Sequence, residues 1–306
     1  MKIKNVIKAI YTGDFGWKSK DWVFNHLCSF LLCNIDLIDI ANKERYFRHL
    51  KNEFCEIIDK ADYSNLERKK SNKVWFCWLQ GYDNAPDLVK ACFMSAQKNM
   101  PKKEIIFLDE TNIFDYINLP DYIIEKYNKG IISKTHFSDV IRISLLSKYG
   151  GLWIDSTVLC TDPNFPAYIT ELPLFVYKLM DLSNQKNRNI VASNWLLSAE
   201  INNPIILLTR DLLYAYWKKY DRLVDYFIFH FFFTMATIKF KEEWKRIPVF
   251  NNHSPHVLQF ELAEAYDEQR WAQIMNMSSF HKLNNHNNYT GYKNSNYQHI
   301  IDLYNK

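Results

Sequence analysis

The chain has 306 residues and a mass of 36.6 kDa, and its 48% hydrophobic and 24% charged residues are typical of a globular protein rather than a disordered one. Glycine is scarce, at 7 residues, and neither G-x-G-x-x-G nor G-x-x-x-x-G-K-[ST] occurs, which argues against the common glycine-rich nucleotide loops. The net charge of +4 is too small to indicate a nucleic-acid partner.

The basic excess is concentrated in two short segments. Residues 1–20 contain five lysines against one aspartate, and residues 67–73 contain four basic residues against one acidic residue. Two interpretations stay open: a solvated surface and linker, or contact with anionic lipid or an anionic acceptor. The second interpretation would put the protein in peripheral contact with a membrane.

Six cysteines occur without C-x-x-C or metal-ligand spacing, and several lie within apolar runs, as buried reduced thiols do. No secretory leader is recognisable, so we expect a cytoplasmic protein. Of the two longest apolar stretches, residues 22–40 are interrupted by polar residues and residues 226–238 are too short to span a bilayer. We therefore expect no transmembrane helix.

Residues 1–70 are predicted to form a helical N-terminal extension to a main domain over residues 71–306. Within residues 42–60, apolar side chains recur at the spacing of one helix face, and these are Phe47, Leu50, Phe54, Ile57 and Ile58. Residues 64–73 are polar and predict a linker between the two parts.

From residue 73 onward the pattern alternates between strand and helix. Strands are predicted over residues 74–79, 104–108 and 152–159, and helices after Pro86 and over about residues 137–148. The first run, VWFCWL, is typical of a strand covered on both faces. The alternation predicts an α/β fold of the Rossmann type, with a mainly parallel central sheet that binds ligands at the carboxyl ends of its strands.

The second half of the chain is less regular. Further strands are expected over residues 174–179 and 193–199. Asn203-Pro204 is a favourable N-cap and first-turn pair for a helix to about residue 219, and a second, aromatic helix is expected over residues 221–239.

The most informative segment is residues 136–161, with the sequence HFSDVIRISLLSKYGGLWIDSTVLCT. Asp139 and Arg142 are three residues apart and are therefore neighbours on one helix face. The helix is predicted to end at Gly150, and Gly151 allows the backbone to come close to a ligand or to a packed neighbour.

In the strand that follows, the two-residue alternation puts Trp153, Asp155 and Thr157 on one face. A carboxylate on an otherwise apolar central strand is costly unless it is paired or bound to a metal ion. Asp155 is therefore a candidate for either a metal site or an ion pair.

The string S-D-x-x-R-x-x-x-L-x-x-x-G-G-x-W-x-D-x-T in this segment resembles the capsular polysaccharide synthesis proteins, which are related to sugar transferases with a D-x-D motif. The resemblance extends over about residues 74–283. It is carried by further motifs in the expected order, which are Trp78 with Gln80 and Gly81, Asn194-Trp195, Asp225 to His230, Pro255-His256 and His281-Lys282-Leu283.

This resemblance implies a GT-A fold and the transfer of a sugar from a nucleoside-diphosphate sugar, expected to be a UDP-sugar, to a saccharide acceptor that can be lipid-linked. It implies that Asp139 and Arg142 contact the donor sugar. It also implies that Asp155 holds a Mn²⁺ or Mg²⁺ ion that bridges the diphosphate, a role that suits carboxylate oxygen. The remaining donor contacts are expected from Trp78, Gln80, Gly81, Gly151, Trp153 and Lys282.

The segment departs from a strict D-x-D pattern because the second acidic position is Thr157, whose hydroxyl is a weaker metal ligand. His281 is a further candidate for metal or phosphate contact. Related families mostly retain the anomeric configuration, which requires no protein base. If this enzyme inverts instead, a carboxylate such as Asp225 would have to act as the general base.

Each assignment has a simpler structural alternative. The Asp139–Arg142 pair can lie on a surface helix, Asp155 can pair with a buried arginine, and the two tryptophans can belong to the core. The Phe227–Phe233 cluster is predicted to be core, and a wall of the acceptor site or a membrane-facing patch is its alternative. The sequence thus predicts a cytoplasmic glycosyltransferase of capsular polysaccharide synthesis. The alternatives are a non-catalytic protein that binds nucleotide sugars, or a metal-dependent phosphotransferase or hydrolase built around Asp155 with Asp109.

Overall fold

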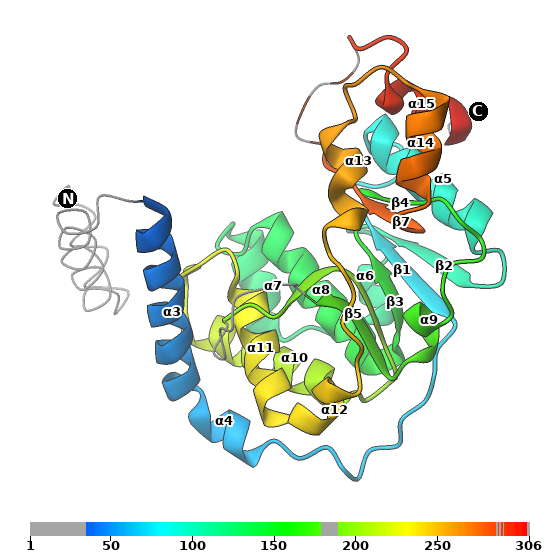
Figure 1. Ribbon diagram of the computed structural model, residues 1–306. Helices are drawn as coiled ribbons and strands as arrows, with labels where there is room; N and C mark the ends of the chain where they lie inside the picture. Colours follow the sequence, from blue (N-terminus) through cyan, green and yellow to red (C-terminus); the bar gives the residue numbers. More distant parts are fainter. Residues whose placement is uncertain (1–34, 179–188, 286, 288, 290, 305–306) are drawn as a thin grey trace, which may run out of the picture.

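The computed structural model describes residues 35–178, 189–285, 287, 289 and 291–304, and its centre is a five-stranded sheet (Figure 1). The strand order is β2-β1-β3-β6-β5. These strands are β1 (Lys73–Cys77), β2 (Glu104–Leu108), β3 (Gly151–Ile154), β5 (Leu174–Lys178) and β6 (Ala192–Ala199). Only β6 runs against the other four, so the predicted α/β class with a mainly parallel central sheet is confirmed.

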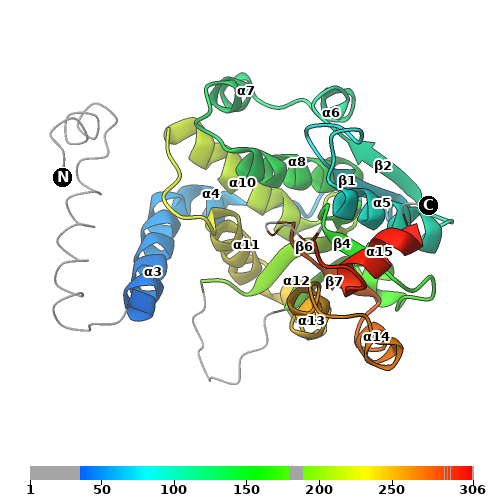
Figure 2. The same ribbon diagram turned by 90° about the horizontal axis from the view of Figure 1, so that it is seen from above.

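Helices cover both faces of the sheet (Figures 1 and 2). One face packs against α8 (Lys134–Tyr149), α10 (Pro204–Lys219) and α11 (Ile228–Lys239), and the other against α5 (Asp87–Asn99) and the C-terminal elements. In β1, Trp75 and Cys77 belong to the first core and Val74 and Phe76 to the second. The strand is therefore buried on both faces, as its continuous apolar run predicted.

The N-terminal helices α3 (Ile35–Glu53) and α4 (Cys55–Lys60) confirm the helical prediction for residues 42–60, with a break at Phe54. Phe47, Leu50 and Phe54 are buried in the same core as the phenylalanines of α11, and the Phe54 and Phe232 ring centroids lie 5.7 Å apart. In Figure 1 these helices flank α11 at the edge of the fold. The division at residue 70 stays a prediction, and residues 1–34 lie outside the described part of the chain.

Local signals set the ends of the two central helices. The Ser133 hydroxyl accepts the N–H of His136 at the start of α8, and Gly150, with φ of 61°, follows its last turn. At the start of α10, the side chain of Asn203 accepts the N–H groups of Ile205 and Ile206. The end of α8 and the start of α10 agree with the prediction, whereas α8 starts at Lys134, ahead of the predicted residue 137.

The predicted strand over residues 152–159 is two strands. β3 ends at Ile154, and a turn closed by the Val158 N–H donating to the Asp155 carbonyl leads to β4 (Val158–Cys160). β4 leaves the central sheet and pairs antiparallel with β7 (Phe280–Lys282). The prediction that Thr157 shares a strand face with Trp153 and Asp155 is therefore wrong, because the chain turns at Asp155.

The second aromatic helix starts at Ile228 rather than at residue 221. The Asp225 carboxylate accepts the N–H of Phe227, and the Tyr216 hydroxyl donates to the Arg222 carbonyl and accepts the Val224 N–H. These bonds satisfy the backbone in a non-helical path. Most of the Phe227–Phe233 cluster is buried and confirms the prediction of a core cluster.

The remaining helices are short. They are α6 (Ile113–Tyr116), α7 (Asp121–Asn128), α9 (Tyr168–Glu171), α12 (Lys241–Lys245), α13 (Val257–Phe260), α14 (Glu268–Met275), α15 (Asn296–Tyr304) and a 3₁₀ turn over Ser254–His256. Among the helices of the described residues, none is both long and apolar enough to cross a membrane.

The four cysteines in the described part of the chain are free thiols. Cys77, Cys92 and Cys160 are buried, whereas Cys55 is exposed. Burial raises the pKa of Cys77 and of Cys160 to about 12, so both thiols are protonated and unreactive at neutral pH. The predicted buried, reduced thiols are confirmed for these three residues.

The topology defines where a ligand would bind. From β1 the chain passes through α5 to the outer strand β2, and it then returns through α8, on the opposite face, to β3 on the other side of β1. The strand order therefore reverses between β1 and β3. In open α/β sheets this switch point, at the carboxyl ends of the strands, is where ligands bind.

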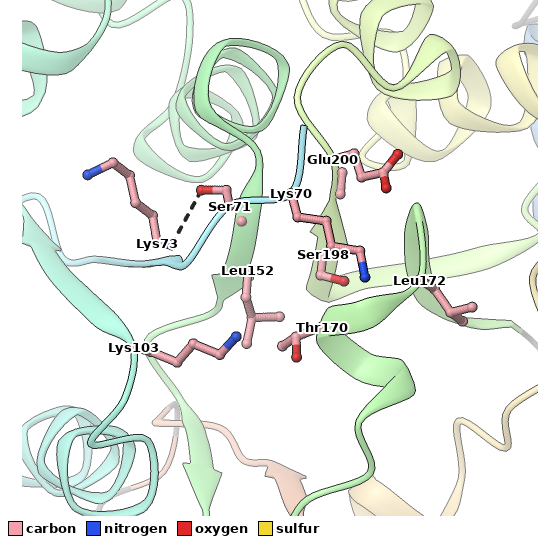
Figure 3. A pocket seen from close by; sticks show the side chains of 11 residues that line it. Lys70, Ser71, Lys73, Lys103, Leu152, Thr170, Leu172, Ser198 and Glu200 are labelled. Carbon is pink, nitrogen blue, oxygen red and sulfur yellow. Dashed lines mark hydrogen bonds between the residues drawn. The ribbon is translucent and has the colours of Figure 1, made fainter. Parts of the chain in front are cut away.

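Gly151 supports the sheet at the opposite end, where β3 starts beside β1. Its φ is 95°, and a Cβ built there would lie 2.3 Å from the Lys73 carbonyl oxygen. The hollow at this end has a volume of only about 10 Å³, and Figure 3 shows the Leu152 side chain pointing into it and the Lys73 side chain pointing away. The close approach that Gly151 permits is thus to a packed strand, and the structure gives no support to the predicted donor contact.

Replacing Gly151 with alanine is expected to cost more than about 2 kcal/mol of unfolding free energy, because a positive φ and a backbone clash combine. Gly130→Ala is the matched control, since Gly130 has φ of 70° but nothing within 4 Å of a built Cβ. It should cost only about 1 kcal/mol. Urea unfolding of both variants measures the difference, and equal losses would contradict the packing argument.

Candidate active site

A cavity of about 770 Å³ lies at the switch point. It is lined by the residues that follow β1, the N-terminal half of α8, the end of β3, the start of β6 and the segment around Lys282. This volume is within the range of pockets that hold small molecules. The cavity coincides with the motif that the sequence singled out, since it is lined by Asp139, Arg142 and Asp155.

Seven of the twelve predicted site residues line this cavity, and these are Trp78, Gln80, Asp139, Arg142, Trp153, Asp155 and Lys282. The other five do not line it, and these are Gly81, Gly151, Thr157, Asp225 and His281. The structure thus brings Asp139 and Arg142 of α8 together with Asp155 and with Lys282. Asp139 and Lys282 are 143 positions apart in the sequence (282 minus 139).

Arg142 is the centre of the site and is only 4% exposed. Its guanidinium donates to the Asp139 carboxylate on one side and, at 2.8 Å, to Asp155 Oδ1 on the other. The rings of Trp153 and Phe229 lie 4.9 Å and 5.5 Å from it. The buried charge is therefore paired twice and enclosed by aromatic faces, which fixes its position.

The charges of this group are stabilised by one another. Burial by itself would lower the pKa of Arg142, but Asp155 and Asp139 outweigh it and hold the pKa above its usual value. Burial would likewise raise the pKa of Asp139, but Arg142 and His136 hold it below its usual value. Both groups are therefore ionised at neutral pH.

Lys282 extends this row of charges. Its Nζ donates to the Thr157 hydroxyl at 2.7 Å and lies 3.5 Å from Asp155 Oδ2. The pairing of β7 with β4 sets this position, because Lys282 is opposite Val158 and the Leu283 N–H donates to the Thr157 carbonyl. Thr157 is thus a partner of Lys282 rather than part of the cavity wall.

The donor set around Asp155 does not fit the expected divalent cation. Asp155 Oδ1 already accepts from Arg142 and, at 2.9 Å, from Trp153 Nε1, and Lys282 lies between the other oxygen and Thr157. No group of three His, Cys, Asp or Glu side chains suited to a metal occurs among the described residues. An ammonium group has no lone pair and cannot serve as a ligand.

The two tryptophans have different positions. Trp153 is 1% exposed, and its ring covers Arg142 while its N–H binds Asp155, so it holds the charged group in place. Trp78 is partly exposed where β1 ends, and its buried Nε1 has no hydrogen-bond partner within the described part of the chain. That N–H is a donor available to a ligand.

Three of the residues that do not line the cavity are Gly81, Asp225 and His281. Gly81 follows the cavity wall in a turn near Asp109. Asp225 binds the Phe227 N–H ahead of α11, and burial raises its pKa. His281 is the middle residue of β7 and is fully buried, and burial lowers its pKa to about 4. The structure therefore gives no support to His281 as a metal ligand or to Asp225 as a base.

Four further residues shape the cavity or hold its charged group. The Asn194 amide donates to Asp139 Oδ1 at 3.1 Å, and His136 Nδ1 lies 3.6 Å from Asp139 Oδ2. His230 and Tyr226 line the cavity, and Tyr226 is 61% exposed. The sequence placed Asn194 and His230 in motifs but indicated no contact, since both come from elements distant in the chain.

These features are those of an α/β protein with a small-molecule site at the switch point of its sheet. A sequence model described as capsular polysaccharide synthesis protein matches residues 35–300, so the chain belongs to this family and the predicted resemblance is confirmed. A solved structure named PaToxG glycosyltransferase is similar with 16% identity and a TM-score of 0.39, over 86% of this chain and 97% of that one. No curated protein matches the chain.

The burial of His281 predicts acid sensitivity. Its pKa is about 4 in the folded protein and about 6.5 when unfolded, so the unfolded state binds more protons between these values and stability falls as pH decreases through this window. The parent protein should therefore lose roughly 2 kcal/mol of unfolding free energy through this residue between neutral pH and about pH 5, and His281→Leu should abolish that part of the loss.

Urea unfolding at several pH values measures this effect. His253→Leu is the control, because His253 is exposed and its replacement should leave the pH dependence unchanged. A His281→Leu protein as acid-sensitive as the parent would contradict the assignment.

Proposed function

We propose that this chain is a glycosyltransferase of surface polysaccharide synthesis, which transfers a sugar from a nucleoside-diphosphate sugar to a saccharide acceptor. The observation that carries the proposal is the buried Asp139–Arg142–Asp155 group in the wall of a cavity at the switch point, in a member of the capsular polysaccharide synthesis family. Paired carboxylate and guanidinium groups suit the recognition of sugar hydroxyls, which both donate and accept hydrogen bonds.

The arrangement of the cavity suggests how the donor binds. Trp78 and Gln80, where β1 ends, would lie beside the nucleoside, and the free N–H of Trp78 supplies a donor for it. Asp139 and Arg142 would orient the sugar. A UDP-sugar stays our expectation for the donor, and the cytoplasm for the site of the reaction.

The carboxylates of the cavity favour retention of the anomeric configuration. Among the described residues that line it, the only acidic ones are Asp139 and Asp155, and each accepts hydrogen bonds from Arg142 and one other group. Neither is free to take a proton from the acceptor. In a retaining transfer, the departing phosphate can take that proton.

The acceptor would enter beside Tyr226 and Phe227, which line the cavity ahead of α11. Tyr226 is largely exposed, and an exposed aromatic face suits stacking on a sugar ring. A lipid-linked acceptor, with contact between the protein and a membrane surface, is consistent with our expectation from the basic segments of the sequence.

Asp139→Asn tests the donor-sugar assignment. The change keeps the size of the side chain but removes the charge that pairs with Arg142, so we expect sugar release from the donor to fall roughly 100-fold. The matched control is Asp211→Asn, whose carboxylate pairs with Arg210 and Tyr63 away from the cavity and whose loss should leave the rate unchanged.

The measurement is the release of nucleoside diphosphate from a panel of UDP- and GDP-sugars, with circular dichroism to confirm that both variants fold. Wild-type release by Asp139→Asn would contradict its role. If the parent protein neither binds nor cleaves any nucleotide sugar but is stabilised by simple phosphate esters, the glycosyltransferase proposal is wrong and the phosphohydrolase alternative gains support.

A further inference from the structure

The Lys282 ammonium lies between the two positions that hold a metal ion in a D-x-D motif. In a strict D-x-D site, a divalent cation is held by two carboxylates two residues apart. Here the first is Asp155 and the second is replaced by Thr157, and the Lys282 ammonium lies between them, 3.5 Å from the carboxylate and 2.7 Å from the hydroxyl.

The charges of the cavity wall are already balanced. The two carboxylates, Asp139 and Asp155, are matched by two basic side chains, Arg142 and Lys282, in a continuous row. Because Thr157 stands at the second acidic position of the motif, this wall has one negative charge fewer than a D-x-D site has for a divalent cation. A metal ion at this point would meet a nearby ammonium and a carboxylate whose Oδ1 already accepts two hydrogen bonds.

Lys282 is also placed to meet a ligand. It lines the cavity, and its side chain is 22% exposed. Its separation from Asp155 is longer than a good hydrogen bond, so the ammonium can turn toward an anion at little cost. The backbone that carries it is fixed, because β7 pairs with β4 and Leu283 binds the Thr157 carbonyl.

We propose that Lys282 replaces the divalent cation as the counter-charge for the donor diphosphate, so that this protein binds nucleoside diphosphates without metal. The inference rests on the proposed glycosyltransferase function and concerns the same cavity. It names the ligand class as the diphosphate group of a nucleotide sugar, held by the Lys282 ammonium through charge-assisted hydrogen bonds.

In the reaction, the bond between the anomeric carbon and the β-phosphate oxygen breaks, and its electron pair stays on that oxygen. The acceptor oxygen forms the new bond to the anomeric carbon, and its proton goes to the departing phosphate. Lys282 keeps its protons throughout and donates hydrogen bonds to the phosphate oxygens as their negative charge increases.

The test is calorimetric titration of UDP and of GDP into metal-stripped protein, once with EDTA and once with excess Mn²⁺. We expect binding of at least one of them in EDTA, with an affinity within about twofold of that in Mn²⁺. Lys282→Met should weaken this binding by about tenfold or more, the usual effect of losing a charge-assisted hydrogen bond.

Two further variants separate charge from structure. Lys282→Arg keeps the charge and should bind with an affinity within a few-fold of that of the parent. Lys241→Ala removes an exposed lysine on α12 that does not line the cavity, and it should bind normally.

The double variant Thr157→Asp with Lys282→Ala rebuilds the two-carboxylate pattern, and its binding of nucleoside diphosphate should require Mn²⁺.

Each contrary result has a distinct meaning. Binding that occurs only with Mn²⁺ and is unaffected by Lys282→Met would overturn the inference and leave the glycosyltransferase proposal intact. If neither nucleotide binds with or without metal, while the protein is folded, the proposed function and this inference both fail.

Discussion

The charge of an almost completely buried guanidinium has to be paired with carboxylates inside the protein. For Arg142 this requirement involves three elements, α8, β3 and α11. It projects from α8, pairs with Asp139 on the same helix and with Asp155 after β3, and is enclosed by Trp153 and by Phe229 of α11. Removing an ion from water costs several kcal/mol, and loss of one partner would leave an uncompensated charge. The positions of α8, β3 and α11 are therefore coupled through this residue.

The chain turns at the residue that pairs with this guanidinium. Asp155 directs its carboxylate to Arg142 and Trp153 at the point where β3 has ended at Ile154, and after a turn the chain continues outside the central sheet as β4. β4 in turn pairs with β7, which brings Lys282 to the same carboxylate. The charged wall of the cavity is therefore completed by a residue that lies far from α8 in the sequence.

Much of this could be predicted from local signals. The apolar run of β1 predicts a strand buried on both faces, Asn203-Pro204 predicts the start of α10, and the spacing of Asp139 and Arg142 predicts their contact. The end of β3 could not be predicted, because the polar residues 155–157 are followed directly by the apolar Val158 and Leu159, so that the whole segment resembles one strand. The contact of Thr157 with Lys282 joins residues 125 positions apart and has no periodic signal.

The central claim is that Lys282, beside the Asp139–Arg142–Asp155 group, binds the donor diphosphate. A crystal structure of the protein with UDP, grown in the presence of Mn²⁺ and examined for anomalous scattering, tests it most directly. The account predicts phosphate oxygens within hydrogen-bond distance of Lys282 Nζ and no manganese peak at Asp155. A manganese ion bound to Asp155 with Lys282 turned away, or UDP bound outside the cavity, would contradict it.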